Sequence, residues 1–211
     1  MTGFAWIAFA LTAAFAVADW VAVAASVRKL ELIAKPAVMV GLIAAALLLD
    51  PANFIQRGFF VVALGFGLAS DIFLMLPQDL FLMGLATALV EHLAYIGGFR
   101  ARDFHLDLLG WTGVIVLVSL VVVLPPVYRA LKQDHPSLVW PVVAYVAVFV
   151  VMVFSAGGTG SLIALSGAVL FFWSDGILAW NRFVKPLPGG RLANIVLYHA
   201  GQALLVLSLA S

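Results

Sequence analysis

Two aspartates stand out because each lies within a long apolar stretch. Asp71 and Asp175 both occur in the pattern Ser-Asp-x-x-Leu, about half the chain length apart. Ionisable groups inside a membrane are costly, so they usually face the protein interior and have a function. Two carboxyl groups in a medium of low dielectric do not both ionise easily, so one can act as a general acid and the other as a general base. Such a pair suits hydrolysis through an oxocarbenium-like state, hydrolysis by activated water, or proton coupling in a transporter.

Other polar residues accompany the two aspartates. Glu91 and Tyr95 are four residues apart, as are Tyr198 and Gln202, so each pair shares a helix face. Depths counted along the expected helices place most of these groups in the same half of the membrane as the aspartates, with Glu91 and Gln202 nearer the midplane. The sequence therefore predicts one polar cavity that opens at one end of the bundle. The candidate supporting residues are Lys35, Glu91, His92, Tyr95, Arg182, Tyr198, His199 and Gln202.

Some of these residues also fit structural roles. His92 and His199 can serve as hydrogen-bonded packing residues. Lys35 precedes Pro36 near a helix start, where its amine can extend to the membrane surface. With a phospholipid substrate, Lys35 could equally hold a phosphate.

The composition indicates the elements that must position these groups. Of the 211 residues, 65% are hydrophobic and 10% are charged, against roughly 25% charged in a soluble domain. This excludes a soluble globular enzyme and a disordered chain, and the mean hydropathy of +1.17 agrees. Backbone groups in lipid must bond within their own segment, which predicts an all-α, multi-pass bundle of about eight transmembrane helices forming a single domain over residues 1–211. The expected helices are 3–25, 30–49, 58–76, 80–99, 110–128, 138–154, 161–180 and 192–210.

The arrangement along the chain gives three further expectations. The repeated Ser-Asp pattern ends the third and seventh segments, which raises the hypothesis of two parallel four-helix repeats. Lys and Arg are more frequent in the first, fifth and seventh connections than in the second and fourth, which favours those three as cytoplasmic. No Lys or Arg precedes the first apolar stretch, so we expect that stretch to be a retained helix.

Charge and cysteine content narrow the function classes. The net charge of +1 gives no basic field for nucleic acid, so no nucleic-acid partner is expected. The absence of cysteine excludes disulfides, zinc–thiolate sites, iron–sulfur clusters and thiol nucleophiles. No cofactor and no metal site are expected.

The residues around the aspartates resemble the YhhN lysoplasmalogenase family of eight-helix membrane proteins. The similar segments follow in order over nearly the whole chain, and they differ from the family pattern at Ser70, where glycine is expected. They comprise Lys35-Pro36, residues 67–74, Phe81, residues 84–85, residues 92–95, residues 167–175, residues 178–179, residues 182–183, Tyr198 and Gln202.

The resemblance implies hydrolysis of the vinyl ether bond of lysoplasmalogens, which yields a fatty aldehyde and glycerophosphoethanolamine or glycerophosphocholine. It implies catalysis by Asp71 and Asp175 without a metal, a lysophospholipid substrate, and an integral location in the bilayer, the inner membrane if the source is bacterial. Lys35 or Arg182 would hold the headgroup phosphate, and Tyr198 and Gln202 would orient water or substrate. Another lysolipid or ether lipid remains open as the natural substrate. A proton-coupled transporter or lipid flippase that uses the same carboxylates is the alternative, and a purely structural role is a third.

Overall fold

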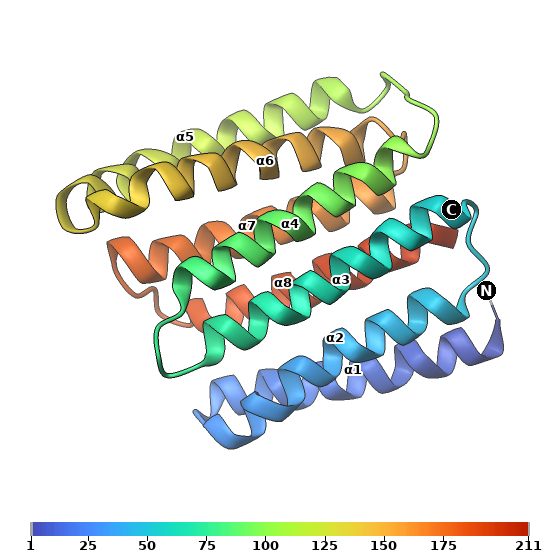
Figure 1. Cartoon of the computed structure of the whole chain (residues 1–211), viewed down its shortest axis with the longest axis horizontal. Helices are drawn as coiled ribbons and strands as arrows, with labels where there is room; N and C mark the ends of the chain where they lie inside the picture. Colours follow the sequence, from blue (N-terminus) through green and yellow to red (C-terminus); the bar gives the residue numbers. More distant parts are fainter. Residues whose placement is uncertain (1, 211) are drawn as a thin grey trace.

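The computed structural model describes residues 2–210, and its helices run side by side along one common direction (Figure 1). Eight helices in the described part are long and apolar enough to cross a membrane, which confirms the predicted all-α, multi-pass class. Three short turns accompany them: the 3-10 turns η1 (Pro136–Leu138) and η3 (Ser208–Ala210) and the π-helical turn η2 (Trp180–Val184). The long helices are α1 Gly3–Ala24, α2 Arg28–Leu48, α3 Phe54–Met75, α4 Phe81–Arg100, α5 Leu109–Asp134, α6 Val139–Gly157, α7 Leu162–Ala179 and α8 Gly190–Leu207.

Polar caps set the start of several helices. The Asn53 side chain accepts hydrogen bonds from the backbone N–H groups of Ile55 and Gln56, at 2.8 and 3.0 Å. This cap starts α3 at Phe54, four residues before the predicted start, because it satisfies N–H groups that have no partner within the helix. Thr2 caps α1 in the same way by accepting from the N–H of Ala5.

α4 and α6 end one and three residues later than predicted, at Arg100 and Gly157, and α5 and α7 continue furthest beyond their predicted ends. α5 continues six residues past residue 128 to Asp134, because the segment that follows is rich in helix-forming residues whose charged side chains suit the aqueous end of a helix. α7 passes into the π-helical turn and does not end at Trp180, so the helical path reaches Val184. Charged residues therefore mark the limit of the apolar layer better than the limit of the helix.

The tightest packing involves helices that follow one another in the chain. α1 packs most extensively on α2, α3 on α4, and α7 on α8. A Cβ atom on Gly201 would lie 2.8 Å from the backbone nitrogen of Phe171 and 2.9 Å from the carbonyl oxygen of Gly167, so α7 and α8 approach closely along small residues. In two equivalent four-helix halves, the pair α5 and α6 would correspond to the pair α1 and α2. α5 packs on α6 far less than α1 packs on α2. The hypothesis of two parallel repeats therefore stays a prediction.

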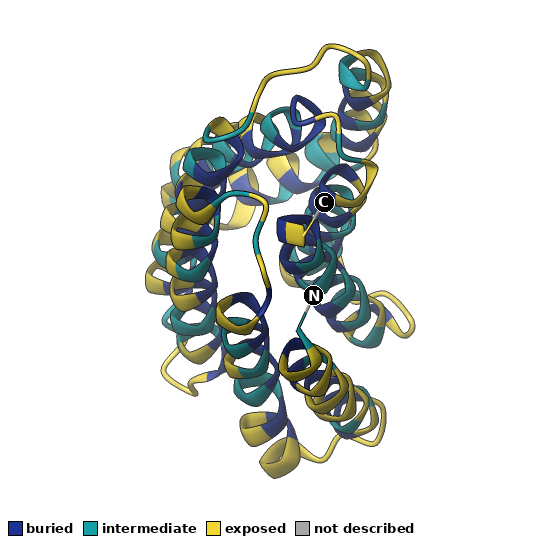
Figure 2. Ribbon diagram, turned by 90° about the vertical axis from the view of Figure 1, so that its right-hand side faces the viewer, coloured by how far each residue is buried: buried dark blue, intermediate teal, exposed yellow. Residues whose placement is uncertain are grey.

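The outside of the bundle is apolar and several polar groups are inside. Figure 2 shows buried residues on the helix faces that point inward and exposed residues on the outer faces. Trp111 and Trp140 are exposed, whereas Asp71, Glu91 and His92 are buried. An apolar outer surface of this kind suits contact with lipid. The polar side chains that could take part in a reaction therefore lie at the centre of the bundle.

Candidate functional site

A cavity of about 320 Å³ lies within the bundle and is lined by residues from all eight helices. We call it the central cavity. It extends to the end of the bundle where α2 and α8 begin and α3 ends, since Arg28, Met75 and Arg191 line it. Its deeper lining is mostly aromatic and aliphatic, including Phe149, Phe171 and Leu120. Six of the predicted site residues line it: Lys35, Asp71, Glu91, Asp175, Arg182 and Tyr198.

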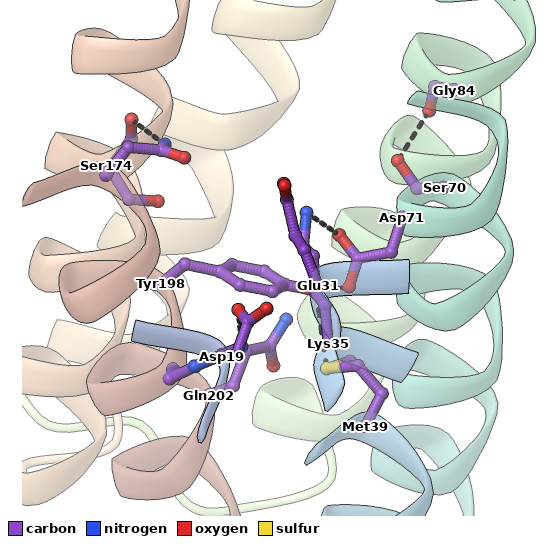
Figure 3. A network of polar contacts seen from close by, with 12 residues as sticks. Asp19, Glu31, Lys35, Met39, Ser70, Asp71, Gly84, Ser174, Tyr198 and Gln202 are labelled. Atoms are coloured by element: carbon purple, nitrogen blue, oxygen red, sulfur yellow. Dashed lines mark hydrogen bonds and ion pairs between the residues drawn. The ribbon is translucent and has the colours of Figure 1, made fainter. Parts of the chain in front are cut away.

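Asp71 lies in the last turns of α3 and is held by a cation and a hydroxyl. Its Oδ1 is 2.8 Å from Nζ of Lys35 on α2, and its Oδ2 accepts a hydrogen bond from the Tyr198 hydroxyl of α8 at 2.9 Å (Figure 3). The preceding Ser70 hydroxyl donates to the Gly84 carbonyl of α4 at 2.9 Å, so serine links α3 to α4 where the family resemblance leads one to expect glycine. Lys35 thus supplies a positive charge and Tyr198 a hydrogen-bond donor to the Asp71 carboxyl group.

Asp175 lies on α7 in a different environment. The Tyr145 hydroxyl of α6 donates to its Oδ2, and the Ser174 hydroxyl lies 3.4 Å from its Oδ1. Among residues 2–210, no Lys, Arg or His nitrogen lies within ion-pair distance of Asp175. The two aspartates therefore share a cavity but differ in charge compensation.

His92 lies behind Asp175, away from the cavity lining. Its Nε2 is 2.8 Å from the Tyr145 hydroxyl, and its ring packs 3.9 Å from the ring of Phe149, measured between centroids. With the Tyr145 hydroxyl assigned as the donor to Asp175, the proton of the His92–Tyr145 contact is assigned to His92 Nε2. His92 thereby orients Tyr145, which in turn contacts the carboxyl group.

Glu91 is a third carboxyl group in the lining, and it is only 1% exposed. Gln202 Nε2 donates to its Oε1 at 2.5 Å, and the Tyr95 hydroxyl donates to Gln202 Oε1 at 2.5 Å. These two hydrogen bonds join the Glu91–Tyr95 face of α4 to the Tyr198–Gln202 face of α8, and the sequence identifies each of these faces only by itself. Glu91 also packs against Gly67, where a Cβ atom would lie 2.5 Å from Oε1.

His199 does not line the cavity and interacts with α1. The Trp20 indole N–H donates to its Nδ1 at 3.1 Å, and its Nε2 lies 3.9 Å from Oδ2 of the fully buried Asp19. Neither Asp19 oxygen has a hydrogen-bond partner in the described part of the chain.

Arg182 lies at the rim of the central cavity on the turn η2. Its Nη2 is 2.7 Å from Oδ1 of Asp79, and its guanidinium lies 4.2 Å from the centre of the Phe81 ring. It shares the cavity with Asp175, but its charge is paired with an exposed carboxylate from the connection between α3 and α4.

Sequence reasoning missed two features of the site. Tyr145 contacts Asp175 directly, but in an apolar segment a single tyrosine is typical of packing. Glu31 is buried at the start of α2 and pairs with Arg28 and Arg191, at 3.0 and 2.9 Å. The spacing of three residues between Arg28 and Glu31 could have indicated their pair, but the sequence gives no signal for Arg191.

The donor set gives no indication of a metal. Within residues 2–210, no three His, Asp or Glu side chains come together in a way that could hold a metal ion. The cavity presents carboxyl groups, hydroxyl groups, side-chain amides, one amine and, towards its mouth, guanidinium groups, which are able to donate, accept and stabilise protons and charge.

The fold and the cavity define an eight-helix membrane protein with a carboxylate-lined interior. The YhhN family model matches residues 30–209, and the chain belongs to the YhhN family. It is 34% identical to human lysoplasmalogenase TMEM86B over 130 residues, which are 61% of this chain and 53% of the human protein. It is 37% identical to mouse lysoplasmalogenase TMEM86B over 143 residues, which are 65% of this chain and 57% of the mouse protein. The chain therefore spans little more than half the length of these relatives, and no solved structure matches it significantly.

Proposed function

We propose that this protein is a membrane hydrolase that cleaves the vinyl ether bond of lysoplasmalogens. The products are a fatty aldehyde and a glycerophosphodiester such as glycerophosphoethanolamine. The observation that carries the proposal is the difference between two aspartates in one cavity, because Asp71 is paired with Lys35 and Asp175 has no cation. Membership of the YhhN family and similarity to proteins named lysoplasmalogenase support the choice of substrate.

The charge environment assigns a role to each aspartate. Asp71 is the ionised residue, because the Lys35 amine and the Tyr198 hydroxyl compensate its charge. Asp175 is the protonated residue, because a carboxylate without a cation is costly in a buried site. Tyr145 and Ser174 hold the Asp175 carboxyl group in place.

The reaction then needs only these two groups and one water molecule. Asp175 donates its proton to the outer carbon of the vinyl group, and the carbon bonded to the ether oxygen becomes an oxocarbenium ion. Asp71 stabilises this cation and accepts a proton from the water that attacks it, which gives a hemiacetal.

The hemiacetal collapses as Asp71 returns a proton to the glycerol oxygen and Asp175 accepts the hemiacetal hydroxyl proton. The carbon–oxygen bond to glycerol breaks, the aldehyde leaves, and both aspartates regain their starting states.

The test is aldehyde release from lysoplasmenylethanolamine by the purified protein in detergent. We expect Asp71→Asn and Asp175→Asn each to lower turnover by at least about a thousandfold, because each removes one side of acid–base catalysis. Asp50→Asn is the matched control, since Asp50 lies exposed after α2 and has no polar contact in the described chain. Thermal unfolding of each variant checks that it is folded.

Full turnover in either cavity variant would contradict the proposed roles. Cleavage of a different lysolipid, but not of the vinyl ether, would retain the mechanism class and change the substrate. Movement of lipid or protons across liposomes without bond cleavage would instead support the transporter alternative.

A further inference from the structure

Two arginines meet where the central cavity reaches the end of the bundle. Arg28 begins α2 and Arg191 lies at the start of α8, 163 positions along the chain from it, and both line the cavity. Arg28 Nη1 is 3.0 Å from Oε1 of Glu31, and Arg191 Nη2 is 2.9 and 3.0 Å from the two Glu31 oxygens. One buried carboxylate thus orients two guanidinium groups, and the Arg28–Glu31–Arg191 cluster carries a net charge of +1.

Several N–H groups of the two arginines make no hydrogen bond within the described chain. Arg191 uses only Nη2, so its Nη1 and Nε make no hydrogen bond within the described chain. Arg28 uses Nη1 for Glu31 and Nη2 for the Met75 carbonyl, so its Nε is also free. The Arg28 and Arg191 side chains are 48% and 61% exposed, so a ligand at the mouth can reach them.

The other cations that line the cavity are already paired. Lys35 is 2.8 Å from Asp71, and Arg182 is 2.7 Å from Asp79. These are the two residues expected from the sequence to hold a phosphate. Among the described residues that line the cavity, only the Arg28–Glu31–Arg191 cluster has more positive than negative charge.

We propose that Arg28 and Arg191 bind the phosphate of a single-chain glycerophospholipid whose tail occupies the apolar part of the central cavity. This inference rests on the proposed function and specifies how the substrate is held. Arginine suits the role because its planar fork donates two parallel hydrogen bonds to phosphate oxygens. Both residues lie at the ends of spans, which is the level of the lipid headgroups.

The spacing along α2 and α3 fits such a ligand. Glu31 precedes Lys35 by four residues, and Asp71 precedes Met75, whose carbonyl binds Arg28, by four residues. Four residues of helix rise about 6 Å. In a lysoplasmalogen, the ether oxygen and the phosphorus are separated by five bonds of roughly 1.5 Å, or about 6 Å when extended. A phosphate at the arginines therefore brings the vinyl ether to the level of Asp71.

Binding can be measured without relying on catalysis. The probe is a 1-O-alkyl-glycerophosphocholine, which has no vinyl group and cannot be cleaved by the proposed reaction. The comparison ligand is a 1-O-alkylglycerol with the same tail and no phosphate. Titration calorimetry in detergent gives both affinities, and inorganic phosphate in a third titration tests whether the anion alone is recognised.

We expect Arg191→Gln and Arg28→Gln each to weaken binding of the alkyl-glycerophosphocholine about tenfold, as expected for loss of a charged hydrogen bond. Binding of the alkylglycerol should change less than about twofold in the same variants. Arg191→Lys should retain part of the affinity because it keeps the charge. Arg129→Gln is the control, because Arg129 is an exposed arginine near the same end of the bundle and lies outside the cavity.

Unchanged affinity for the phospholipid in Arg191→Gln and Arg28→Gln would overturn the inference, as would an equal loss for both ligands. Binding of inorganic phosphate as tight as that of the phospholipid would also overturn it, because the tail would then contribute nothing. If the binding results hold but no vinyl ether is cleaved, the phosphate site stands and the proposed reaction fails.

Discussion

At the scale of single residues, the chemistry of the site depends on hydroxyl groups as much as on carboxyl groups. Tyr198 contacts Asp71 and Tyr145 contacts Asp175, so each aspartate has its own tyrosine donor. Each tyrosine comes from a different helix than its aspartate, 127 residues away for Tyr198 and Asp71 and 30 residues away for Tyr145 and Asp175. A carboxyl group held by a fixed donor keeps one orientation towards the substrate, which lowers the cost of reaching the transition state.

This arrangement predicts that Tyr145→Phe slows the reaction while the fold persists. The change removes the hydrogen bond to Asp175 and leaves His92 Nε2 without its partner. Loss of one buried hydrogen bond costs about 1–2 kcal/mol, so turnover should fall about fivefold to thirtyfold. Aldehyde release and thermal unfolding measured on the same sample test this.

Tyr128→Phe provides the comparison, since Tyr128 on α5 is exposed and has no hydrogen-bond partner in the described chain. If Tyr145→Phe lowered the unfolding temperature while turnover stayed close to that of the natural protein, Tyr145 would serve the fold and not the reaction.

At this scale, the sequence indicates the position of a candidate residue where one helix is sufficient. It selects Asp71 and Asp175 because a charge inside an apolar helix is costly, and both line the cavity. It pairs Glu91 with Tyr95 by helical spacing. It could not find the contact of Tyr145 with Asp175 or that of Glu31 with Arg191, because each joins residues whose proximity depends on how the helices pack.

At the scale of helices, the close approach of α7 and α8 fixes the position of Asp175 relative to Tyr198. Gly167 and Gly201 face one another there, and a side chain on either would meet backbone atoms of the other helix. Backbone atoms cannot rotate away as a flexible side chain can, so the contact tolerates little added volume.

We therefore expect Gly201→Ala to destabilise the protein by about 1–3 kcal/mol, because the added methyl group forces α7 and α8 apart. Thermal unfolding in detergent measures the effect. Gly65→Ala on α3 is the matched control, since a Cβ atom there would meet no atom within 4 Å. It should leave stability unchanged or slightly higher. Equal unfolding temperatures for the two variants would mean that the bundle can adjust at this contact.

Most helix positions follow from hydropathy, and the differences have local causes. The Asn53 cap starts α3 early, and helix-forming residues carry α5 beyond the apolar layer. A hydropathy profile registers transfer into lipid, whereas a helix ends where its backbone hydrogen bonds end. The π-helical turn after α7 has no simple sequence signature.

At the scale of the whole molecule, polar groups concentrate towards one end of the bundle. The mouth of the central cavity lies beside the starts of α2 and α8 and the end of α3. The connections at that end are also the ones expected from their basic residues to face the cytoplasm. The end with the mouth should therefore be the cytoplasmic end.

Single cysteines can test this orientation, because the natural chain has none. Lys185→Cys lies in the connection before α8 and Asp103→Cys in the connection after α4, and both positions are exposed. Added to intact cells, a thiol reagent that cannot cross membranes should label Asp103→Cys and spare Lys185→Cys; in inside-out vesicles the pattern should reverse.

Asn194→Cys extends the test to the cavity, which Asn194 lines near the mouth. It should react only from the side that labels Lys185→Cys. Labelling from both sides would indicate access across the whole membrane and would favour a transporter.

The central cavity is charged at its mouth and apolar in its depth, so a lipid that fills it is attached at two points. Each attachment makes the other effectively intramolecular, and the two together hold the ligand far longer than either alone. Cutting the molecule between these points leaves one fragment with only the ionic contact and another with only the apolar contact. Both fragments should then dissociate faster than the intact lipid, so the reaction itself would clear the cavity.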